Sequence, residues 1–205
     1  MQKPNFQKQM EQTIVNLEKA QETPRLLLHS CCAPCSSAVL ERLSSHFQVT
    51  VFYDNPNISP KEEYQKRVEE QKRLLTVLPT KNSFSFLEAD YQPERFYQTV
   101  KGLETEPEGG ARCAACFHLR LEDTARVAKE KNFSFFTTTL SVSPHKNADK
   151  LVEIGLECAH KYGVHYLVSD FKKKNGYLRS IQLSKQYHLY RQNFCGCVFS
   201  KRGEK

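Results

Sequence analysis

The sequence Arg25-Leu-Leu-Leu-His-Ser-Cys-Cys-Ala-Pro-Cys35 joins a short apolar run directly to a group of thiols. Three consecutive leucines between polar residues are typical of a strand buried on both faces of a parallel sheet. Apolar residues at helical spacing follow, from Ala38 to Leu43. Proline is tolerated in the first turn of a helix, so Pro34 is compatible with a helix that begins here. The sequence therefore places three cysteines where a strand ends and a helix starts.

The same alternation continues along the chain. Further strands are predicted at residues 47–53, 84–87, 133–140 and 164–168, and helices at residues 62–78, 93–100, 112–131 and 147–162. Strands that alternate with helices of this length indicate a parallel sheet with helices on both faces. We therefore expect one α/β domain over residues 25–205, with a doubly wound Rossmann-like or HUP-like sheet, preceded by a helical extension over residues 1–24.

Chemically active side chains follow several of these strands. Right-handed crossovers bring the carboxyl ends of parallel strands to one edge of the sheet, where such folds bind their ligands. The first cysteines follow the first strand, Asp54 follows the second, residues 141–146 follow the fourth and Asp170 follows the fifth. We expect a functional site at this edge, built largely from thiols.

Seven of the eight cysteines fall into three groups: Cys31, Cys32 and Cys35; Cys113 and Cys116; and Cys195 and Cys197. The N-terminal segment is polar and has no apolar signal-peptide core, so we expect a cytoplasmic protein whose thiols stay reduced. Thiols grouped in this way indicate metal ligands or redox pairs. The eighth, Cys158, lies among apolar residues of a predicted helix, and we expect it in the core.

The spacing of the groups favours redox chemistry. Two CxxC groups lie about 80 residues apart, and each opens a predicted helix. A zinc ribbon keeps its pairs ~15–20 residues apart, so the longer separation favours an iron–sulfur cluster on a folded domain. The Cys195-Gly-Cys197 spacing gives a tight, strained loop when oxidised, which is typical of a redox-active dithiol. Structural zinc or buried apolar thiols are the alternatives for each group.

Positive charge is concentrated near the C-terminal end. The chain carries a formal charge of +7, and residues 171–205 contain nine Lys or Arg against one Glu. With its interleaved aromatic residues this segment suits a polyanion such as nucleic acid, although a solvated surface explains the charge equally well. The cations that we expect to meet phosphates are Arg112, Lys146, Lys172, Lys173, Arg179 and Arg191.

Other partners are excluded by the absence of their motifs. No apolar run approaches the ~20 residues of a membrane helix, so we expect no membrane association. Neither the P-loop motif nor the GxGxxG motif occurs, so we expect neither ATP nor NAD as a cofactor.

Six motifs, taken in order, resemble one known family. They are His29-Ser-Cys-Cys-Ala-Pro-Cys-Ser36, Tyr53-Asp-Asn-Pro-Asn-Ile58, Arg112-Cys-Ala-Ala-Cys-Phe-His-Leu-Arg-Leu121, Thr139-Leu-Ser-Val-Ser-Pro-His-Lys146, Asp170-Phe-Lys-Lys173 and Tyr190-Arg-Gln-Asn-Phe-Cys-Gly-Cys197. From about Arg25 to Ser200 the chain is similar to the cobalamin-independent epoxyqueuosine reductases, the QueH family. This resemblance implies the two-electron reduction of the epoxide of epoxyqueuosine, at the wobble position of a tRNA with a GUN anticodon, to queuosine.

The resemblance also implies roles for the thiols. Cys31, Cys32, Cys113 and Cys116 would hold a [4Fe-4S] cluster, and Cys195 and Cys197 would form a redox-active pair. Asp170 is a further catalytic candidate, and an additional mononuclear iron would lie near Cys35 and Asp170. The implied reaction needs no cobalamin, and it needs an electron donor that the sequence does not identify.

Three other functions compete with this interpretation. An iron–sulfur tRNA-thiolating enzyme would share the fold, although the missing phosphate loop counts against its need for ATP. A non-catalytic, zinc-stabilised RNA-binding protein would leave the Cys195–Cys197 spacing unexplained. A disulfide reductase built on Cys32-Ala-Pro-Cys35 would need no iron.

Overall fold

The computed structural model describes residues 4–200. Residues 1–3, the start of the predicted helical extension, and residues 201–205, the end of the basic segment, lie outside the described residues. Its first half contains α1 (Phe6–Ala20), β1 (Arg25–His29), α2 (Ala33–Leu43), β2 (Gln48–Tyr53), α3 (Lys61–Val77), β3 (Ser85–Glu88) and α4 (Pro93–Thr99). The second half contains α5 (Ala111–Glu130), β4 (Phe135–Thr138), the 3₁₀ turn η1 (Thr139–Val142), α6 (Ala148–Tyr162), β5 (His165–Tyr166), α7 (Gly176–Gln186) and η2 (Val198–Ser200).

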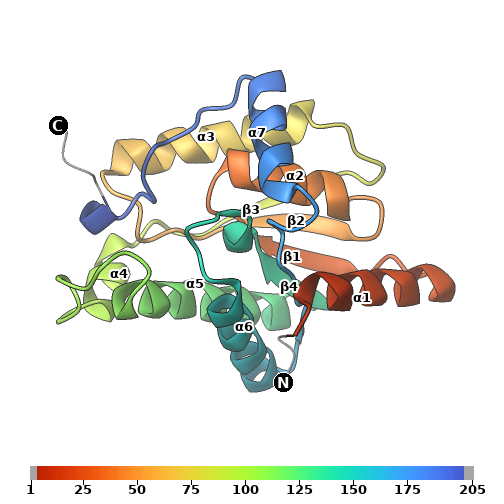
Figure 1. Ribbon diagram of the computed structural model, residues 1–205, viewed down its shortest axis with the longest axis horizontal. Coiled ribbons are helices and arrows are strands. Elements are labelled where there is room, and N and C mark those ends of the chain that lie inside the picture. The colour runs from red at the N-terminus through yellow and green to blue at the C-terminus, as the bar shows by residue number, and fades with distance from the viewer. Residues whose placement is uncertain (1–3, 201–205) are drawn as a thin grey trace.

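The predicted doubly wound sheet is confirmed (Figure 1). Within residues 4–200, five parallel strands lie in the order β3-β2-β1-β4-β5. The strand order reverses beside β1, which pairs with β2 on one side and with β4 on the other. Crevices that bind ligands form at this reversal point in such sheets. The fold therefore places the end of β1, and the cysteines that follow it, at the expected site.

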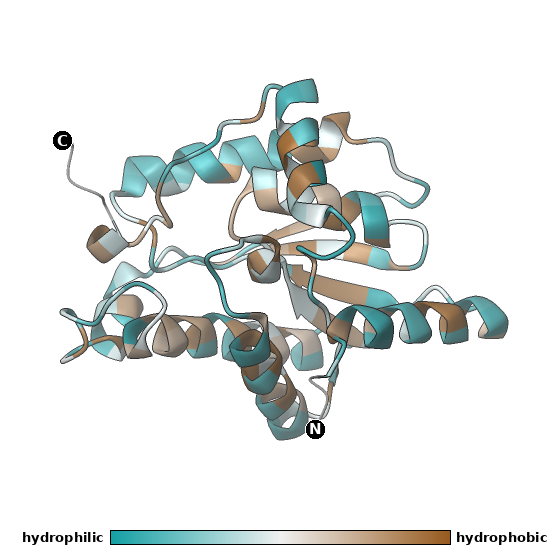
Figure 2. Cartoon of the chain, in the orientation of Figure 1, coloured by the Kyte–Doolittle hydropathy of each residue, from teal (hydrophilic) through white to brown (hydrophobic). Residues whose placement is uncertain are grey.

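The two faces of the sheet have separate cores. Side chains alternate along β1, so Leu26 and Leu28 pack with residues of α1, α2 and α3, whereas Leu27 packs with residues of α5 and α6. Figure 2 shows hydrophobic residues concentrated on the strands and on helix sides that face them, whereas α3 is hydrophilic on its outer side. The buried face of each helix thus fixes its place on the sheet. Cys158 lies in the α5–α6 core, as predicted.

The last two strands are shorter than predicted. Residues 133–140 read as a strand because they are rich in Phe and Thr, yet β4 ends at Thr138. The hydroxyl of Thr138 accepts a hydrogen bond from the Leu140 N–H at 3.1 Å, which turns the chain into η1. Its neighbour β5 extends only over His165–Tyr166, which pair with Phe135 and Phe136 of β4.

Helix α7 was not predicted from the sequence. Its buried positions are Gly176, Ser180, Leu183 and Ser184, so its inward face has a single large apolar residue and little hydrophobic periodicity. The small residues let α7 pack closely on α2.

No helix within residues 4–200 is long and apolar enough to cross a bilayer.

Helix α1 docks on the domain through its apolar stripe. Met10 is 1% exposed and, with Leu17, packs in the same core as Leu26 and Leu28 of β1. The Asn5 side chain caps the helix by accepting a hydrogen bond from the Lys8 N–H at 3.0 Å. The helix therefore contributes to the core on one side of the sheet.

If α1 is part of this core, Met10→Ala should lower the free energy of unfolding by about 2–4 kcal/mol, the usual cost of such a truncation. Val15 is 39% exposed on the same helix, so Val15→Ala should stay within about 0.5 kcal/mol of the parent. Urea unfolding curves measure both values. Equal midpoints for the two variants would show that the helix does not dock in solution.

Candidate functional site

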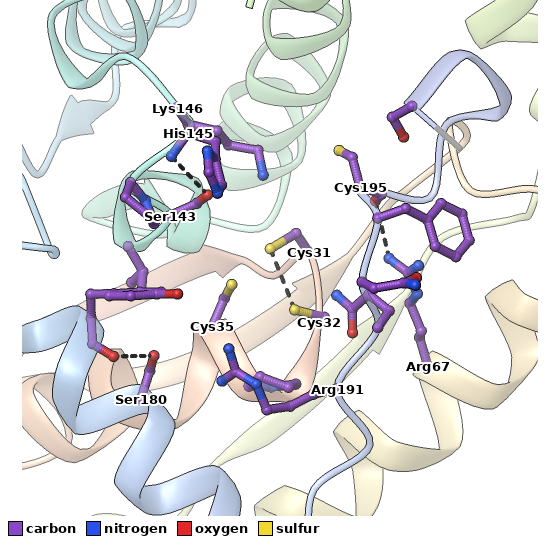
Figure 3. A pocket seen from close by; sticks show the side chains of 18 of the residues that line it. Cys31, Cys32, Cys35, Arg67, Ser143, His145, Lys146, Ser180, Arg191 and Cys195 are labelled. Carbon is purple, nitrogen blue, oxygen red and sulfur yellow. Dashed lines mark hydrogen bonds between the residues drawn. The ribbon is translucent and has the colours of Figure 1, made fainter. Parts of the chain in front are cut away.

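Three thiols converge where β1 ends and α2 begins (Figure 3). The Sγ atoms of Cys31, Cys32 and Cys35 all lie within 4.8 Å of one another, and those of Cys31 and Cys32 are 3.8 Å apart. Cys32 is the N-cap of α2, and its carbonyl accepts from the Ser36 N–H at 3.1 Å. The positive end of the helix dipole favours negative charge at this position. We call these three residues the thiol group.

Cys31 ionises most readily of the thiol group. Hydrogen bonds from Cys32 and Cys35 lower its pKa well below that of an ordinary thiol. The hydrogen bond with Cys31 raises the pKa of Cys32 to about 11, and interaction with Cys31 likewise raises the pKa of Cys35 well above its usual value. Three buried thiolates would repel one another, and a bound metal cation would remove this penalty. The group therefore has the chemistry of a metal site.

The thiol group sits at the point where the strand order reverses. The Cys31 N–H donates to Thr139 Oγ1 at 3.2 Å, and the Thr139 hydroxyl in turn donates to Cys31 Sγ at 3.5 Å. Thr139 directly follows β4, so these contacts join the ends of β1 and β4. The sheet topology thus fixes the position of Cys31.

A buried cation lies beneath the thiol group. Arg120 is 1% exposed; its Nε donates to His29 Nε2 at 3.2 Å and one of its terminal nitrogens donates to Asn55 Oδ1 at 2.5 Å. Burial is the main cause that lowers the pKa of His29 to about 3, and the positive charge of Arg120 is the next, so the imidazole is neutral. The other ring nitrogen, Nδ1, lies 2.9 Å from Thr138 Oγ1, and Nε2 also lies 3.2 Å from the Asp54 carbonyl. His29 therefore orients groups and does not hold a charge.

A second charged layer lies behind Arg120. Burial raises the pKa of Asp54 to about 7, and the nearby carboxylate of Asp123 raises it further. Asp123 forms an ion pair with Arg95, whose side chain reaches solvent. Asp54 therefore belongs to this layer and not to the group of three thiols.

The C-terminal segment crosses over the thiol group and is held by Arg67 of α3. Arg67 is 2% exposed, donates to the Cys195 carbonyl at 3.0 Å and pairs with Glu63 at 2.6 Å. The Ser59 N–H donates to the Gly196 carbonyl at 2.9 Å. Gly196 has a φ of +110°, and a Cβ there would lie 2.9 Å from Ile58, so this turn requires glycine. These contacts fix Cys195 over the site.

The thiol group and Cys195 line the same cavity, of about 240 Å³ (Figure 3). Lys146 and Arg191 also line it. Burial would lower the pKa of Lys146, but electrostatic interaction with the sulfurs of Cys195 and Cys31 raises it above the usual value, so the side chain is a cation. We call this space the thiol cavity.

The other predicted ligands lie outside the group of three. Cys113 and Cys116 open α5; the Gly109 N–H donates to Cys113 Sγ at 3.2 Å, and Cys116 packs with Cys197. Asp170 pairs with Lys172 at 2.9 Å and lines a neighbouring cavity that shares only Pro144 and Lys146 with the thiol cavity. All eight cysteines are free thiols. The structure thus unites Cys35 with Cys31 and Cys32, and it separates Asp170 from Cys35.

The six predicted phosphate contacts divide by position. Lys146 and Arg191 line the thiol cavity, and Lys172 and Lys173 line its neighbour. Arg179 lies elsewhere, in an ion pair with Glu41. Arg112 is 4% exposed, and its guanidinium donates to the carbonyls of Glu104 and Glu106, so its contact with a phosphate stays a prediction.

Sequence analysis missed three buried polar residues that build the site: Arg67, Gln71 and Arg120. Gln71 Oε1 accepts from the hydroxyls of Ser30 and Ser36, both at 2.8 Å, and so fixes the loop around the thiol group. Arg67 and Gln71 lie on the buried stripe of α3, and Arg120 lies one turn after Cys116 on α5. Their positions on apolar stripes were the available signal.

The comparisons with known proteins agree on one family. The family model described as "Epoxyqueuosine reductase QueH" matches residues 26–203. A protein of that name from Streptococcus pyogenes serotype M1 is 43% identical over 203 residues, which cover 98% of this chain and 80% of that protein. A protein of the same name from Staphylococcus epidermidis is 43% identical over 97% of this chain and 85% of its own. Another from Thermotoga maritima is 37% identical over 88% of this chain and 93% of its own.

A search of solved structures gives a weaker similarity. The NMN synthetase from Francisella tularensis aligns over 94% of this chain and 77% of its own, with a TM-score of 0.46 and 10% sequence identity.

Proposed function

The chain belongs to the epoxyqueuosine reductase QueH family, and from this premise we propose that its reaction takes place in the thiol cavity between Cys31 and Cys195. The protein is an oxidoreductase of queuosine biosynthesis. One observation carries the proposed location: Cys195, of the predicted redox pair, lines the same cavity as the three thiols suited to a metal.

The proposed substrate is a tRNA with a GUN anticodon that carries epoxyqueuosine at its wobble position. Lys146 and Arg191 line the thiol cavity, where they can neutralise phosphates beside the reacting nucleotide. Lys172 and Lys173, in the neighbouring cavity, extend this cationic surface. We place the protein in the cytoplasm, where free thiols stay reduced.

Removal of the epoxide oxygen requires two electrons and two protons. The thiols of Cys195 and Cys197 can supply both, because their oxidation to one disulfide releases two electrons and two protons. The two C–O bonds of the epoxide break, a C=C bond forms, and the oxygen leaves as water. Gly196, with its positive φ, permits the turn in the backbone between the two cysteines. An external electron donor then reduces the disulfide.

Lys146 and Arg67 have supporting roles. Lys146 is a cation in the thiol cavity and can stabilise the negative charge that develops on the epoxide oxygen. Arg67 holds the Cys195 carbonyl and so keeps the dithiol over the thiol group.

The thiol group is suited to an iron centre by its donor set. Sulfur ligands select iron–sulfur clusters and zinc, and three Sγ atoms converge here beside a buried cation that favours thiolates. We propose that Cys31 and Cys32 with Cys113 and Cys116 hold a [4Fe-4S] cluster, and that Cys35 binds an adjacent mononuclear iron. When bound, these groups would supply one-electron transfer and Lewis acidity. Asp170 lies in the neighbouring cavity, so we omit it from the second iron site.

Metal content tests this assignment. After anaerobic purification we expect about four irons and four acid-labile sulfides per chain for the cluster, with one more iron for the second site. Cys32→Ser should lose iron and sulfide together, and Cys35→Ser should lose the additional iron. Cys158→Ala, on α6 and outside the lining of the thiol cavity, is the control and should keep the metal content of the parent. Zinc without sulfide would contradict the assignment.

The dithiol is tested by turnover. Cys195→Ser and Cys197→Ser should each lower the rate of queuosine formation roughly 100-fold or more, because neither can complete the disulfide. Mass spectrometry of nucleosides from an epoxyqueuosine-containing tRNA measures the product, and Cys158→Ala should react at the parent rate. Full turnover by either serine variant would show that the dithiol is not the electron source.

A further inference from the structure

The basic C-terminal segment carries six aromatic residues, and most are committed to contacts within the chain. Phe171 is buried, and Tyr187 is partly buried against the core. Tyr190 donates to Glu63 at 3.0 Å, and Lys66 Nζ lies 3.7 Å from its ring centroid. Phe194 lies against Arg67, and Phe199 lies against Phe96 and Arg112. The sixth, Tyr177, is 38% exposed and, like Phe194, lines the thiol cavity. Unlike Phe194, Tyr177 has no arginine within residues 4–200 lying over its ring.

The backbone under Tyr177 is rigid. A Cβ on Gly176 would lie 1.9 Å from the Phe171 carbonyl oxygen, so the first turn of α7 is packed tightly against the preceding loop. Ser180 Oγ donates to the Tyr177 carbonyl at 2.7 Å (Figure 3). The aromatic ring is thus exposed at the cavity while its main chain is fixed. A rigid aromatic surface of this kind loses little entropy when a flat ligand packs on it.

A residue that lines the same cavity carries a buried acceptor in need of a donor. Among the residues that the structure describes, Gln192 Oε1 is buried and has no hydrogen-bond partner, and Gln192 lines the thiol cavity. A buried acceptor left unpaired is costly, so a ligand with an N–H group would be favoured there. A guanine-type base presents N–H donors along its Watson–Crick edge, and its ring provides a face for stacking.

We propose that Tyr177 is the stacking platform for the extruded wobble base, with Gln192 accepting a hydrogen bond from the edge of that base. This inference rests on the proposed function, since it takes the modified nucleotide as the substrate. Enzymes that modify a base extrude it into a pocket and hold it by stacking and edge contacts. The thiol cavity, at about 240 Å³, admits a single base and not a stem. A base on Tyr177 lies in the cavity that Cys31, Cys35 and Cys195 also line.

Kinetics of the metal-loaded protein test the stacking role. With an anticodon stem-loop carrying epoxyqueuosine, Tyr177→Ala should raise KM by ~10-fold or more, the scale of one base–aromatic stack. Tyr177→Phe should behave as the parent, because the ring and not the hydroxyl makes the contact. Tyr97→Ala is the matched control, since Tyr97 is 41% exposed and lies outside the thiol cavity. An unchanged KM for Tyr177→Ala would overturn the proposal.

A fluorescence measurement reports the contact directly. The chain contains no Trp, so Tyr177→Trp introduces a single indole into the cavity. Its emission should be quenched by the stem-loop, and that of Tyr97→Trp should not. If the stem-loop quenches the emission but the parent protein forms no queuosine, the result would support the base site and contradict the proposed reaction. Turnover by the parent with no quenching and no KM effect would remove the base site alone.

Discussion

The site depends on a guanidinium that has no access to solvent. Arg120 donates to the end of β1 through His29 and to the loop after β2 through Asn55, and it reaches Cys116 Sγ at 3.9 Å. A buried cation is costly unless it is paired, so each of these contacts must form for the charge to be tolerated. Because its partners come from three separate parts of the chain, Arg120 aligns the sheet edge with α5. It also places positive charge beside the thiols and so favours their ionised forms.

A second buried arginine has the corresponding role on the opposite side of the cavity. Arg67 joins α3 to the C-terminal segment, and Gly196 provides the turn that lets this segment approach. The loop that contains Cys195 is therefore held by a side chain more than a hundred residues earlier in sequence. This contact explains how Cys195, on a segment with little regular structure, lines the same cavity as the thiols at the head of α2. The thiol group follows a strand and opens a helix, whereas Cys195 lies on a loop tied to α3.

The architecture could be predicted from the sequence because the hydrophobic pattern of the strands and their alternation with helices were clear. Leu26, Leu27 and Leu28 indicated a strand buried on both faces, and the cysteines that follow it lie where parallel sheets bind ligands. The early end of β4 could not be predicted, because it depends on a hydrogen bond of the Thr138 side chain. Helix α7 could not be predicted either, because its buried face consists mostly of small residues. Arg112 has a surface-like residue type, yet local carbonyls bury it. Spacing grouped Cys35 with Cys31 and Cys32, as the structure does. Whether Cys113 and Cys116 join them depends on tertiary packing, which spacing does not determine.

The central claim is that the Cys195–Cys197 dithiol supplies the two electrons that remove the epoxide oxygen. The most direct test is a single turnover with fully reduced, metal-loaded protein, an epoxyqueuosine stem-loop and no external reductant. Mass spectrometry then counts queuosine in the RNA and disulfide in the peptide that contains both cysteines. The account predicts one new Cys195–Cys197 disulfide for each queuosine formed. Queuosine formed while both thiols remain free would contradict it.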